Sequence, residues 1–280
     1  MSTFYFLTVS GIGLYVRESI APVFLTKIIL FNLSLVLFYE INKEVKCGDR
    51  NMIKTYLLDI NGLFDDKLFQ DNFNIMSSYR QNKIKNYKFR IDQNLSLGAG
   101  ILLNYGLQQY GLRELDMEYA IGINNKPCFL NKPDIRFNIS HSGTMVICSF
   151  SDKEIGVDIE KITEGSIDID IAKRFFCISE YEYIIRQNNS IEQKEAFYRL
   201  WVLKESFMKV TGIGMTLLFD SFEIVMADNI SVEQSVDDQK YFFKEYKVDD
   251  YRIAICSTIA DQDDGVENCD CAIQFLCNSL

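Results

Sequence analysis

The order of apolar and polar positions predicts strands and helices that alternate along most of the chain. Residues 53–60 are rich in strand-forming side chains and predict a first core strand. Residues 95–107 form an apolar run of helical length, with Gly98 and Gly100 as tolerated interruptions. Two short apolar runs, 145–150 and 155–160, are joined by four polar residues, a pattern typical of a β-hairpin.

A long helix is predicted at about residues 191–210. Ser190 and Gln193 make a capping-box pattern at its start, and Gly212 suits the position just past its end. On a helical wheel with Leu200 at zero, most apolar side chains fall on one arc.

The remaining pattern favours an α+β fold in two lobes. Residues 241–248 and 251–257 predict further strands. Strands in hairpins mixed with helices are typical of α+β architecture. We expect an N-terminal lobe at 52–152 and a C-terminal lobe at 153–280.

The first fifty residues differ from the rest. Residues 21–39 are apolar but contain Lys27, and the run is borderline in length for a membrane span. Three interpretations stay open: a membrane anchor, an extra element packed on the domain, or upstream sequence that is not normally translated. Met52 directly precedes the first predicted strand. We therefore expect residues 1–51 to be an extension dispensable for activity, and membrane association to be absent.

Composition excludes several classes of protein. Of 280 residues 48% are hydrophobic, which excludes a mainly disordered chain. The formal charge of −10 makes a general nucleic-acid binder improbable, so phosphate chemistry needs a local basic site. A single histidine, His141, excludes most histidine-rich zinc and iron sites. Eight cysteines without a CxxC pair are typical of small buried side chains in a reducing compartment, which predicts a cytoplasmic protein.

The run at 155–160 carries candidate chemistry. In a strand, Gly156, Asp158 and Glu160 share one face, and neighbouring carboxylates repel each other unless a cation lies between them. An ordinary solvated face explains this pattern, and so does a Mg²⁺ site, because Mg²⁺ takes one or two carboxylates plus substrate phosphates.

The long helix and the lone histidine leave similar alternatives. Lys204 falls near +40°, inside the apolar arc of the wheel, and Glu205 at about +140°, on its border. Lys204 either extends its ammonium to solvent or meets a phosphate. His141 lies between two serines, where it is either structural or close to a bound anion. With Lys126 and the basic stretch 80–90, these signals together specify a site for a polyphosphate and Mg²⁺.

Three blocks carry a family resemblance. Residues 137–143, 156–160 and 197–209 resemble, in order and spacing, the signature blocks of the Sfp-type 4′-phosphopantetheinyl transferase family. The Lys126-Pro127 pair and residues 172–181 are similar too, and the resemblance runs from 52 to about 257.

The resemblance implies a role for each matching residue. Asp158, Glu160 and Glu205 would hold Mg²⁺ with the pyrophosphate of coenzyme A, and His141 would contact the 3′-phosphate. Lys204 would contact the phosphates, and Glu205 or a metal-bound water would take the serine proton. The remaining coenzyme A contacts implied by the family are Lys126, Ser140, Arg80, Lys83 and Lys209.

The resemblance also implies the reaction and the architecture. The 4′-phosphopantetheine of coenzyme A would move to a serine of an apo acyl or peptidyl carrier protein, with release of adenosine 3′,5′-bisphosphate. The fold would be two similar α+β lobes related by a pseudo-twofold axis, with the active site between them, in a monomer. The helix around 175–185 would contact the carrier protein.

One departure from the family pattern opens an alternative function. Many relatives carry an arginine that touches the 3′-phosphate where this chain has Leu95, followed by Ser96. A binding module that kept the coenzyme A site but lost turnover is therefore one alternative. A membrane-tethered protein, from the apolar run at 21–39, is the other.

Overall fold

A computed structural model describes residues 4–9, 12–17, 53–122, 126–165, 169–260, 265–270 and 272–275. The chain divides into two compact units, Met1–Arg50 and Asn51–Leu280. In the first unit, β1 (Phe4–Val9) pairs antiparallel with β2 (Ile12–Arg17). The apolar run at 21–39, Met52 and residues 123–125 before the predicted Lys-Pro turn lie outside the described residues.

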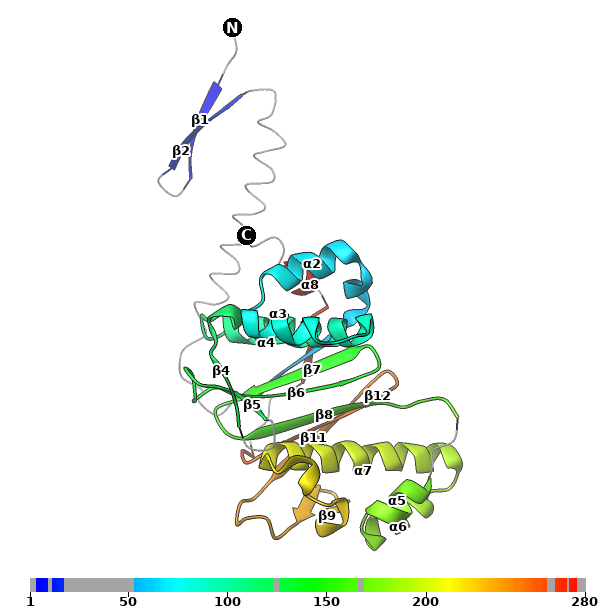
Figure 1. Cartoon of the computed structure of the whole chain (residues 1–280). Coiled ribbons are helices and arrows are strands. Elements are labelled where there is room, and N and C mark those ends of the chain that lie inside the picture. Colours follow the sequence, from blue (N-terminus) through cyan, green and yellow to red (C-terminus); the bar gives the residue numbers. More distant parts are fainter. Residues whose placement is uncertain are drawn as a thin grey trace. The chain divides into compact units, whose positions relative to one another are not determined.

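Two sheets and two helical layers make up the second unit (Figure 1). The first sheet has the order β13 (Val266–Asn268), β3 (Lys54–Asp59), β7 (Met145–Ser151), β6 (Arg136–Ser142), and only the β13–β3 pair is parallel. The helices on its outer face are α4 (Arg90–Gln108), α2 (Asp66–Asn74), α3 (Ser78–Lys85) and α8 (Ala272–Phe275).

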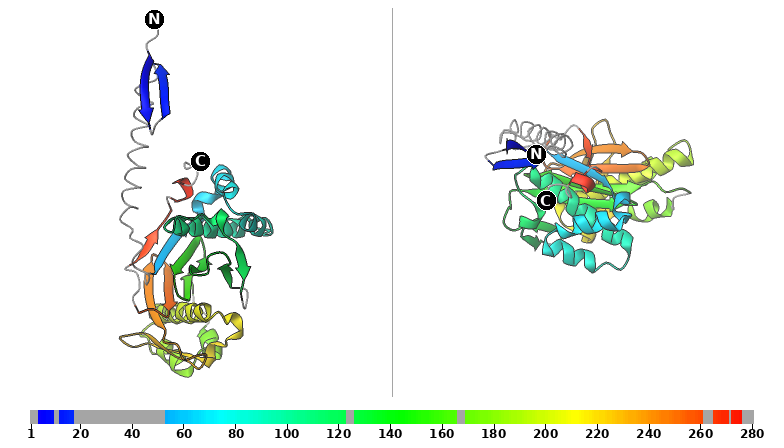
Figure 2. Two further views of the ribbon diagram at one scale, coloured as in Figure 1. Left: turned by 90° about the vertical axis from the view of Figure 1, so that its left-hand side faces the viewer. Right: turned by 90° about the horizontal axis from the view of Figure 1, so that it is seen from above.

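The second sheet lies beneath the first. Its order is β11 (Phe242–Val248), β12 (Tyr251–Ser257), β8 (Ile155–Lys161), all antiparallel. The long helix α7 (Ser190–Thr211) covers its outer face, and the turned view in Figure 2 shows both sheets between the helical layers. Beyond α7 lie α5 (Ile169–Phe175), α6 (Ile178–Ile185), β9 (Glu223–Val225) and β10 (Ser231–Glu233).

Short elements complete the second unit. They are η1 (Ile60–Phe64), η2 (Glu114–Asp116), the β4 (Tyr119–Ile121) and β5 (Pro127–Phe129) hairpin, η4 (Gly214–Thr216) and η5 (Phe219–Ser221). Among the described residues, no helix combines the length and the apolar character needed to cross a membrane.

Strand β8 has the two-faced pattern that its sequence predicts. Ile155, Val157 and Ile159 pack into the apolar core between the two sheets. The opposite face lies against α7 at very close range: a Cβ on Gly156 would stand 2.0 Å from the carbonyl oxygen of Ser206. Only glycine lets the backbone of α7 approach this strand so closely, and this approach sets α7 beside Asp158 and Glu160.

Helix α7 forms where the sequence predicts it, with one difference at its start. The N-cap is Asn189, whose side chain accepts hydrogen bonds from the backbone N–H groups of Ile191 and Glu192, so the predicted capping box of Ser190 was wrong by one residue. Gly212 ends the helix with a φ of 70°, in the left-handed region that glycine tolerates, as predicted.

Two other expectations need correction. The predicted hairpin of 145–150 with 155–160 was wrong: β7 pairs with β3 and β6, whereas β8 pairs with β12. The polar residues between these runs carry the chain from one sheet to the other. Residues 137–142, expected to precede a strand, are themselves part of β6. The C-terminal β13 and α8 pack with the first half of the unit rather than the second, because β13 adds to the free edge of β3.

The fold is mixed α and β, as predicted. The pseudo-twofold relation of two lobes, their boundaries and the monomeric state stay predictions.

Candidate active site

The edge of β8 that does not face β12 is joined to β6 by side chains. Asn138 accepts a hydrogen bond from the backbone N–H of Val157 through its Oδ1, at 2.9 Å. The hydroxyl of Ser142 accepts from the N–H of Lys161 at 3.1 Å and donates to Oε2 of Glu160 at 2.8 Å. Alternate residues of β6 therefore satisfy the backbone of β8 and hold its acidic side chains.

Asp158 is the most enclosed of these acids, 3% exposed. Its Oδ1 accepts a hydrogen bond from the hydroxyl of Ser140 at 2.7 Å and from the ammonium of Lys209 at 2.5 Å. Lys209 also donates to the Ser140 oxygen at 2.9 Å. The second oxygen, Oδ2, is buried without a hydrogen-bond partner in the protein. A buried carboxylate oxygen without a partner is costly, so this atom is suited to an incoming cation or donor.

Glu160 and Glu205 complete an acidic cluster with Asp158. Burial, and then the negative charge of Asp158, raise the pKa of both glutamates above the usual range. Lys209 opposes the rise in both pKa values, and Ser142 does so for Glu160. Both glutamates therefore lie within the electrostatic range of Asp158. Within the described part of the chain, no three acidic, histidine or cysteine side chains already have the arrangement of a metal site.

His141 lies on the opposite face of β6 from Ser140 and Ser142. Its ring reaches the surface, but the surrounding protein still displaces much of its water, and this, together with the positive charge of Lys209, lowers its pKa. Lys83 also lowers the pKa of His141, and Asp92 raises it. His141, Lys83 and Lys209 therefore lie within electrostatic range of one another, and their role at a phosphate site stays a prediction.

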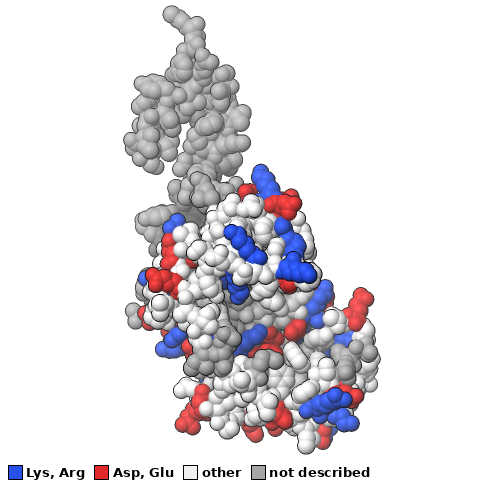
Figure 3. All heavy atoms as spheres, in the orientation of Figure 1, with Lys and Arg blue, Asp and Glu red and all other residues white. Residues whose placement is uncertain are grey.

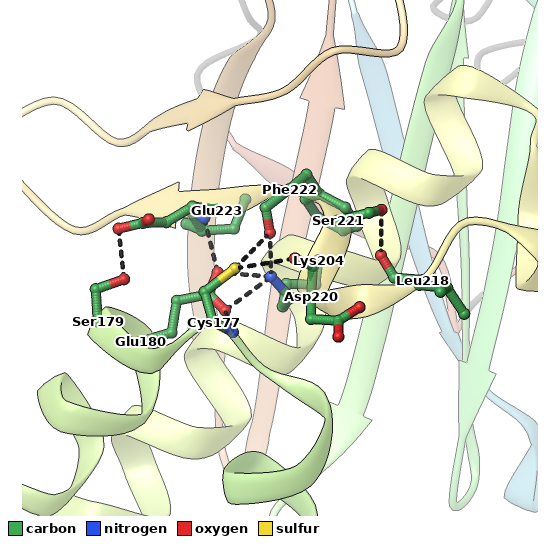
Figure 4. A network of polar contacts seen from close by, with 10 residues as sticks. Cys177, Ser179, Glu180, Lys204, Leu218, Asp220, Ser221, Phe222 and Glu223 are labelled. Carbon is green, nitrogen blue, oxygen red and sulfur yellow. Dashed lines mark hydrogen bonds and ion pairs between the residues drawn. The ribbon is translucent and has the colours of Figure 1, made fainter.

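Lys204 has a different environment from the one expected. Its side chain is fully buried, and its ammonium donates to both carboxylate oxygens of Glu180, at 2.6 and 2.8 Å, and to the Phe222 carbonyl at 2.9 Å (Figure 4). Burial lowers the pKa of Lys204, while the Glu180 carboxylate opposes that effect. The structure therefore places Lys204 inside the apolar arc, as the wheel predicts, but pairs it with Glu180 and not with the acidic cluster.

Arg80 also lies away from the acidic cluster. It is buried beside Glu114, with Nε 3.9 Å from Oε1, and its guanidinium lies 6.0 Å from the ring centroid of Tyr119. Ser77 and Tyr119 donate hydrogen bonds to the same carboxylate. Arg80 therefore belongs to a buried network between α3, η2 and β4.

Lys126 bridges the ends of two elements. Its ammonium donates to Oε2 of Glu154 at 2.9 Å, to the Ile155 carbonyl at 3.3 Å and to the Val210 carbonyl at 3.5 Å. It lines a pocket of about 340 Å³ together with Arg136, Glu154 and residues 211–213 after α7. This position leaves Lys126 close to the end of α7 that carries Lys209.

Sequence reasoning missed Asn138, Ser142 and Glu180 as parts of the site and its frame. The alternation of Asn138, Ser140 and Ser142 indicates one face of a strand. The strand that these side chains contact, β8, belongs to the other sheet, which the local sequence pattern does not show. Glu180 stands in α6, whose packing against α7 no local pattern predicts.

Charges are unevenly distributed over the face drawn in Figure 3. Lys and Arg side chains gather over the helical layer of the first sheet, and acidic side chains are visible between that layer and α7. Basic and acidic side chains thus lie side by side on this face, although the whole chain is acidic.

Comparisons with known proteins agree on one family. Residues 154–256 match the 4′-phosphopantetheinyl transferase superfamily. A 4′-phosphopantetheinyl transferase of Bacillus subtilis is 34% identical over 196 residues, which cover 69% of this chain and 86% of that protein. The 4′-phosphopantetheinyl transferase Sfp of Bacillus subtilis (strain 168) is 33% identical over 73% of this chain and 94% of its own length. The crystal structure of Thermotoga maritima holo-[acyl-carrier-protein] synthase (AcpS) is similar over 37% of this chain and 61% of that chain, with 16% identity and a TM-score of 0.32.

Proposed function

Because the chain belongs to the 4′-phosphopantetheinyl transferase superfamily, we propose that it moves the 4′-phosphopantetheine of coenzyme A to a serine of an apo carrier protein, in a Mg²⁺-dependent reaction that releases adenosine 3′,5′-bisphosphate. The chain is a phosphopantetheinyl transferase by family. The proposal concerns its acceptor, its metal and its second product. The observation that carries it is the cluster of Asp158, Glu160 and Glu205 with Lys209 between β8 and α7.

The donor set fits Mg²⁺. Carboxylate oxygens are the protein ligands that this ion prefers, and it commonly combines one or two of them with substrate phosphates. Oδ2 of Asp158 is buried and unpaired, so a ligand position is available without breaking a hydrogen bond. We assign Asp158, Glu160 and Glu205 as the metal-holding residues. When bound, Mg²⁺ would neutralise the pyrophosphate and polarise the attacked phosphorus.

The protein's own residues would bind and orient coenzyme A. Lys209 is the cation closest to the acidic cluster and would contact the pyrophosphate, while His141 and Lys83 would hold the 3′-phosphate. Ser140 and Ser142 orient Asp158 and Glu160 from β6. Phosphoryl transfer depends mainly on such positioning and on charge neutralisation.

Glu205 would accept the proton of the attacking serine. Its carboxylate lies within the electrostatic range of Asp158, beside the position proposed for the metal and the pyrophosphate. The stabilisation of the leaving phosphate, expected of Lys204 from the sequence, we assign to Lys209, because the Lys204 ammonium is enclosed by Glu180 and Phe222.

The carrier protein would contact the exposed apolar side chains around α5 and α6. Phe175, Ile178 and Leu218 are 56%, 79% and 66% exposed. Phe176 packs against Phe219 beneath them, which brings these segments together. An apolar contact suits an acidic enzyme, because acidic carrier proteins would not be attracted over long distances.

Intact-mass analysis tests the proposal directly. The full chain, coenzyme A and Mg²⁺ are incubated with a panel of apo carrier proteins, and one phosphopantetheine should be added to at least one carrier. EDTA should abolish the addition. Asp158→Asn should lower the rate at least about 100-fold, because a lost metal interaction is worth several kcal/mol in the transition state. Asp238→Asn, at an exposed position, is the matched control.

Three outcomes would contradict the proposal. Addition that resists EDTA, or an Asp158→Asn enzyme as active as wild type, would remove the metal assignment. Binding of coenzyme A without transfer to any carrier would favour the binding module instead. Leu95, which is buried in the apolar core under the first sheet, would then be the first residue to change to arginine.

A further inference from the structure

Lys209 contacts one oxygen of the Asp158 carboxylate, whose other oxygen, Oδ2, is the position proposed for the metal. Its ammonium lies 2.5 Å from Oδ1 of Asp158 and 2.9 Å from the hydroxyl of Ser140. The Asp158 side chain is 4% exposed, whereas that of Lys209 is 26% exposed. The acid is therefore fixed in place, while the lysine approaches it from the more open side.

The charges around this contact oppose a second cation. Lys209 stands one helical turn after Glu205 on α7, so the two side chains share a face of the helix. The ammonium partly neutralises Asp158, Glu160 and Glu205 together. A divalent ion that enters while Lys209 remains would meet a positive charge at short range in a partly dehydrated site, where repulsion is much stronger than in water.

Lysine can leave this position at low cost. Its ammonium is carried by a flexible four-carbon side chain, and the phosphate oxygens of a ligand are good hydrogen-bond acceptors for it. Ser140 would still donate to Oδ1 of Asp158 after the lysine moved, so the carboxylate would keep its orientation.

We propose that Lys209 is the resident counter-ion of the metal-free acidic cluster, and that its transfer from Asp158 to the phosphates of coenzyme A couples the binding of metal and coenzyme A. The inference rests on the proposed function for the identity of both ligands. It adds that Lys209 competes with Mg²⁺ when coenzyme A is absent and assists both ligands when coenzyme A is present.

Calorimetric titration of Mg²⁺ into the full chain tests the competition without any turnover. In the absence of coenzyme A, Lys209→Met should bind Mg²⁺ roughly tenfold more tightly than wild type, because a neighbouring positive charge is removed. Lys194→Met is the matched control: Lys194 stands on the same helix, but its ammonium donates to the carbonyl of Thr163. Lys209→Gln, which keeps a donor for Ser140, should behave like Lys209→Met.

A second titration, in the presence of coenzyme A, tests the coupling. Coenzyme A should raise the Mg²⁺ affinity of wild type by a larger factor than that of Lys209→Met, and by linkage Mg²⁺ should raise coenzyme A affinity more in wild type. Lys209→Met should also bind coenzyme A more weakly.

Unchanged or weaker Mg²⁺ binding by Lys209→Met without coenzyme A would overturn the proposal, and so would the absence of binding by both proteins. Equal coupling factors in the two proteins would overturn it as well. Transfer by wild type in the mass assay reports on the proposed function separately, so the two failures are distinguishable.

Discussion

At the scale of single residues, Ser142 acts on Glu160 without being a candidate ligand itself. One hydroxyl accepts from the backbone of β8 and donates to the glutamate, so the position of the strand and the direction of its side chain are set together. Hydrogen bonds to charged groups are worth about 1.5–3 kcal/mol, more than neutral ones. A carboxylate held in this way loses less freedom when it binds a metal.

Ser142→Ala should therefore raise the Mg²⁺ concentration needed for half-maximal transfer by about tenfold, as is common for groups that orient metal ligands. Ser142→Thr, which keeps the hydroxyl, should restore most of the affinity. Initial rates measured over a Mg²⁺ series separate this effect from a change in kcat. A lower kcat with an unchanged Mg²⁺ requirement would show that the hydroxyl does not act through Glu160.

The charge of Glu205 should destabilise the metal-free protein in a pH-dependent way. Its pKa is raised above the ordinary value of 4.5, first by burial and then by Asp158. Below pH 4.5 the group is protonated in both folded and unfolded chains. As the pH rises, the unfolded chain loses the proton first, so this group's contribution to stability falls until the raised pKa is passed.

Glu205→Gln should thus raise the thermal midpoint in EDTA by an amount that grows from pH 4.5 upward and then levels off. Glu164→Gln, at an exposed position, should show no such growth. The measurement is thermal unfolding at a series of pH values. If Glu205→Gln raises the thermal midpoint by the same amount at every pH, the charge of the Glu205 carboxylate is not what destabilises the protein.

At the scale of elements, the Lys204–Glu180 pair fastens α6 and β9 to α7. Glu180 also accepts hydrogen bonds from the backbone N–H groups of Cys177 and Ile224, so one buried carboxylate joins three segments. The Phe222 ring lies 4.2 Å from the Lys204 ammonium and closes the pair from solvent. The layer that presents the exposed apolar side chains of α5 and α6 is thereby fixed to the helix that carries Glu205 and Lys209.

Lys204→Met should destabilise the protein by about 3–5 kcal/mol, because it leaves the Glu180 charge buried without a partner. Lys204→Met with Glu180→Leu should recover much of this loss. Unfolding by urea, followed by the fluorescence of the single tryptophan, measures both variants. Lys194→Met is again the surface control.

The double variant also separates a structural role from a catalytic one. If Lys204 only fastens α6 to α7, the folded double variant should transfer phosphopantetheine at a rate close to that of wild type. A stable but inactive double variant would return Lys204 to the catalytic machinery.

At the scale of the whole molecule, the site depends on two sheets whose described strands are not paired with each other through their backbones. Asp158 and Glu160 come from the second sheet, Ser140, His141 and Ser142 come from the first, and Glu205 and Lys209 come from the helix behind the second. Between β6 and β8, the side chains of Asn138 and Ser142 accept hydrogen bonds from backbone N–H groups of β8, in place of backbone-to-backbone pairing. The acidic cluster therefore requires both halves of the unit 51–280 to be folded.

The first unit should contribute nothing to this arrangement. A chain that begins at Met52 contains nearly all of the second compact unit. It should unfold at the same temperature as the full chain and transfer phosphopantetheine at an unchanged rate. An insoluble or less active shortened chain, with the full chain intact, would show that residues 1–51 support the fold or the site. Fractionation of the full chain with membranes would favour the tethered alternative.

The sequence by itself determined those parts of the protein that depend on local periodicity and motif spacing. Alternation along 155–160 predicted which residues of β8 face the core, and helical spacing predicted α7 and the place of Lys204 inside its apolar arc. The spacing of the signature blocks, in the same way, indicated the family that the relatives confirm.

Tertiary structure alone decided the partners of those residues. Lys204 pairs with Glu180, and Lys209 takes the place beside Asp158 that sequence reasoning gave to no residue. The predicted hairpin failed for the same reason: polar residues signal a turn but not which sheet the next strand enters. Local patterns set the face on which a side chain lies, because they follow from backbone geometry. The charged partner of a side chain depends instead on long-range packing. That packing is fixed only when the two sheets and α7 come together.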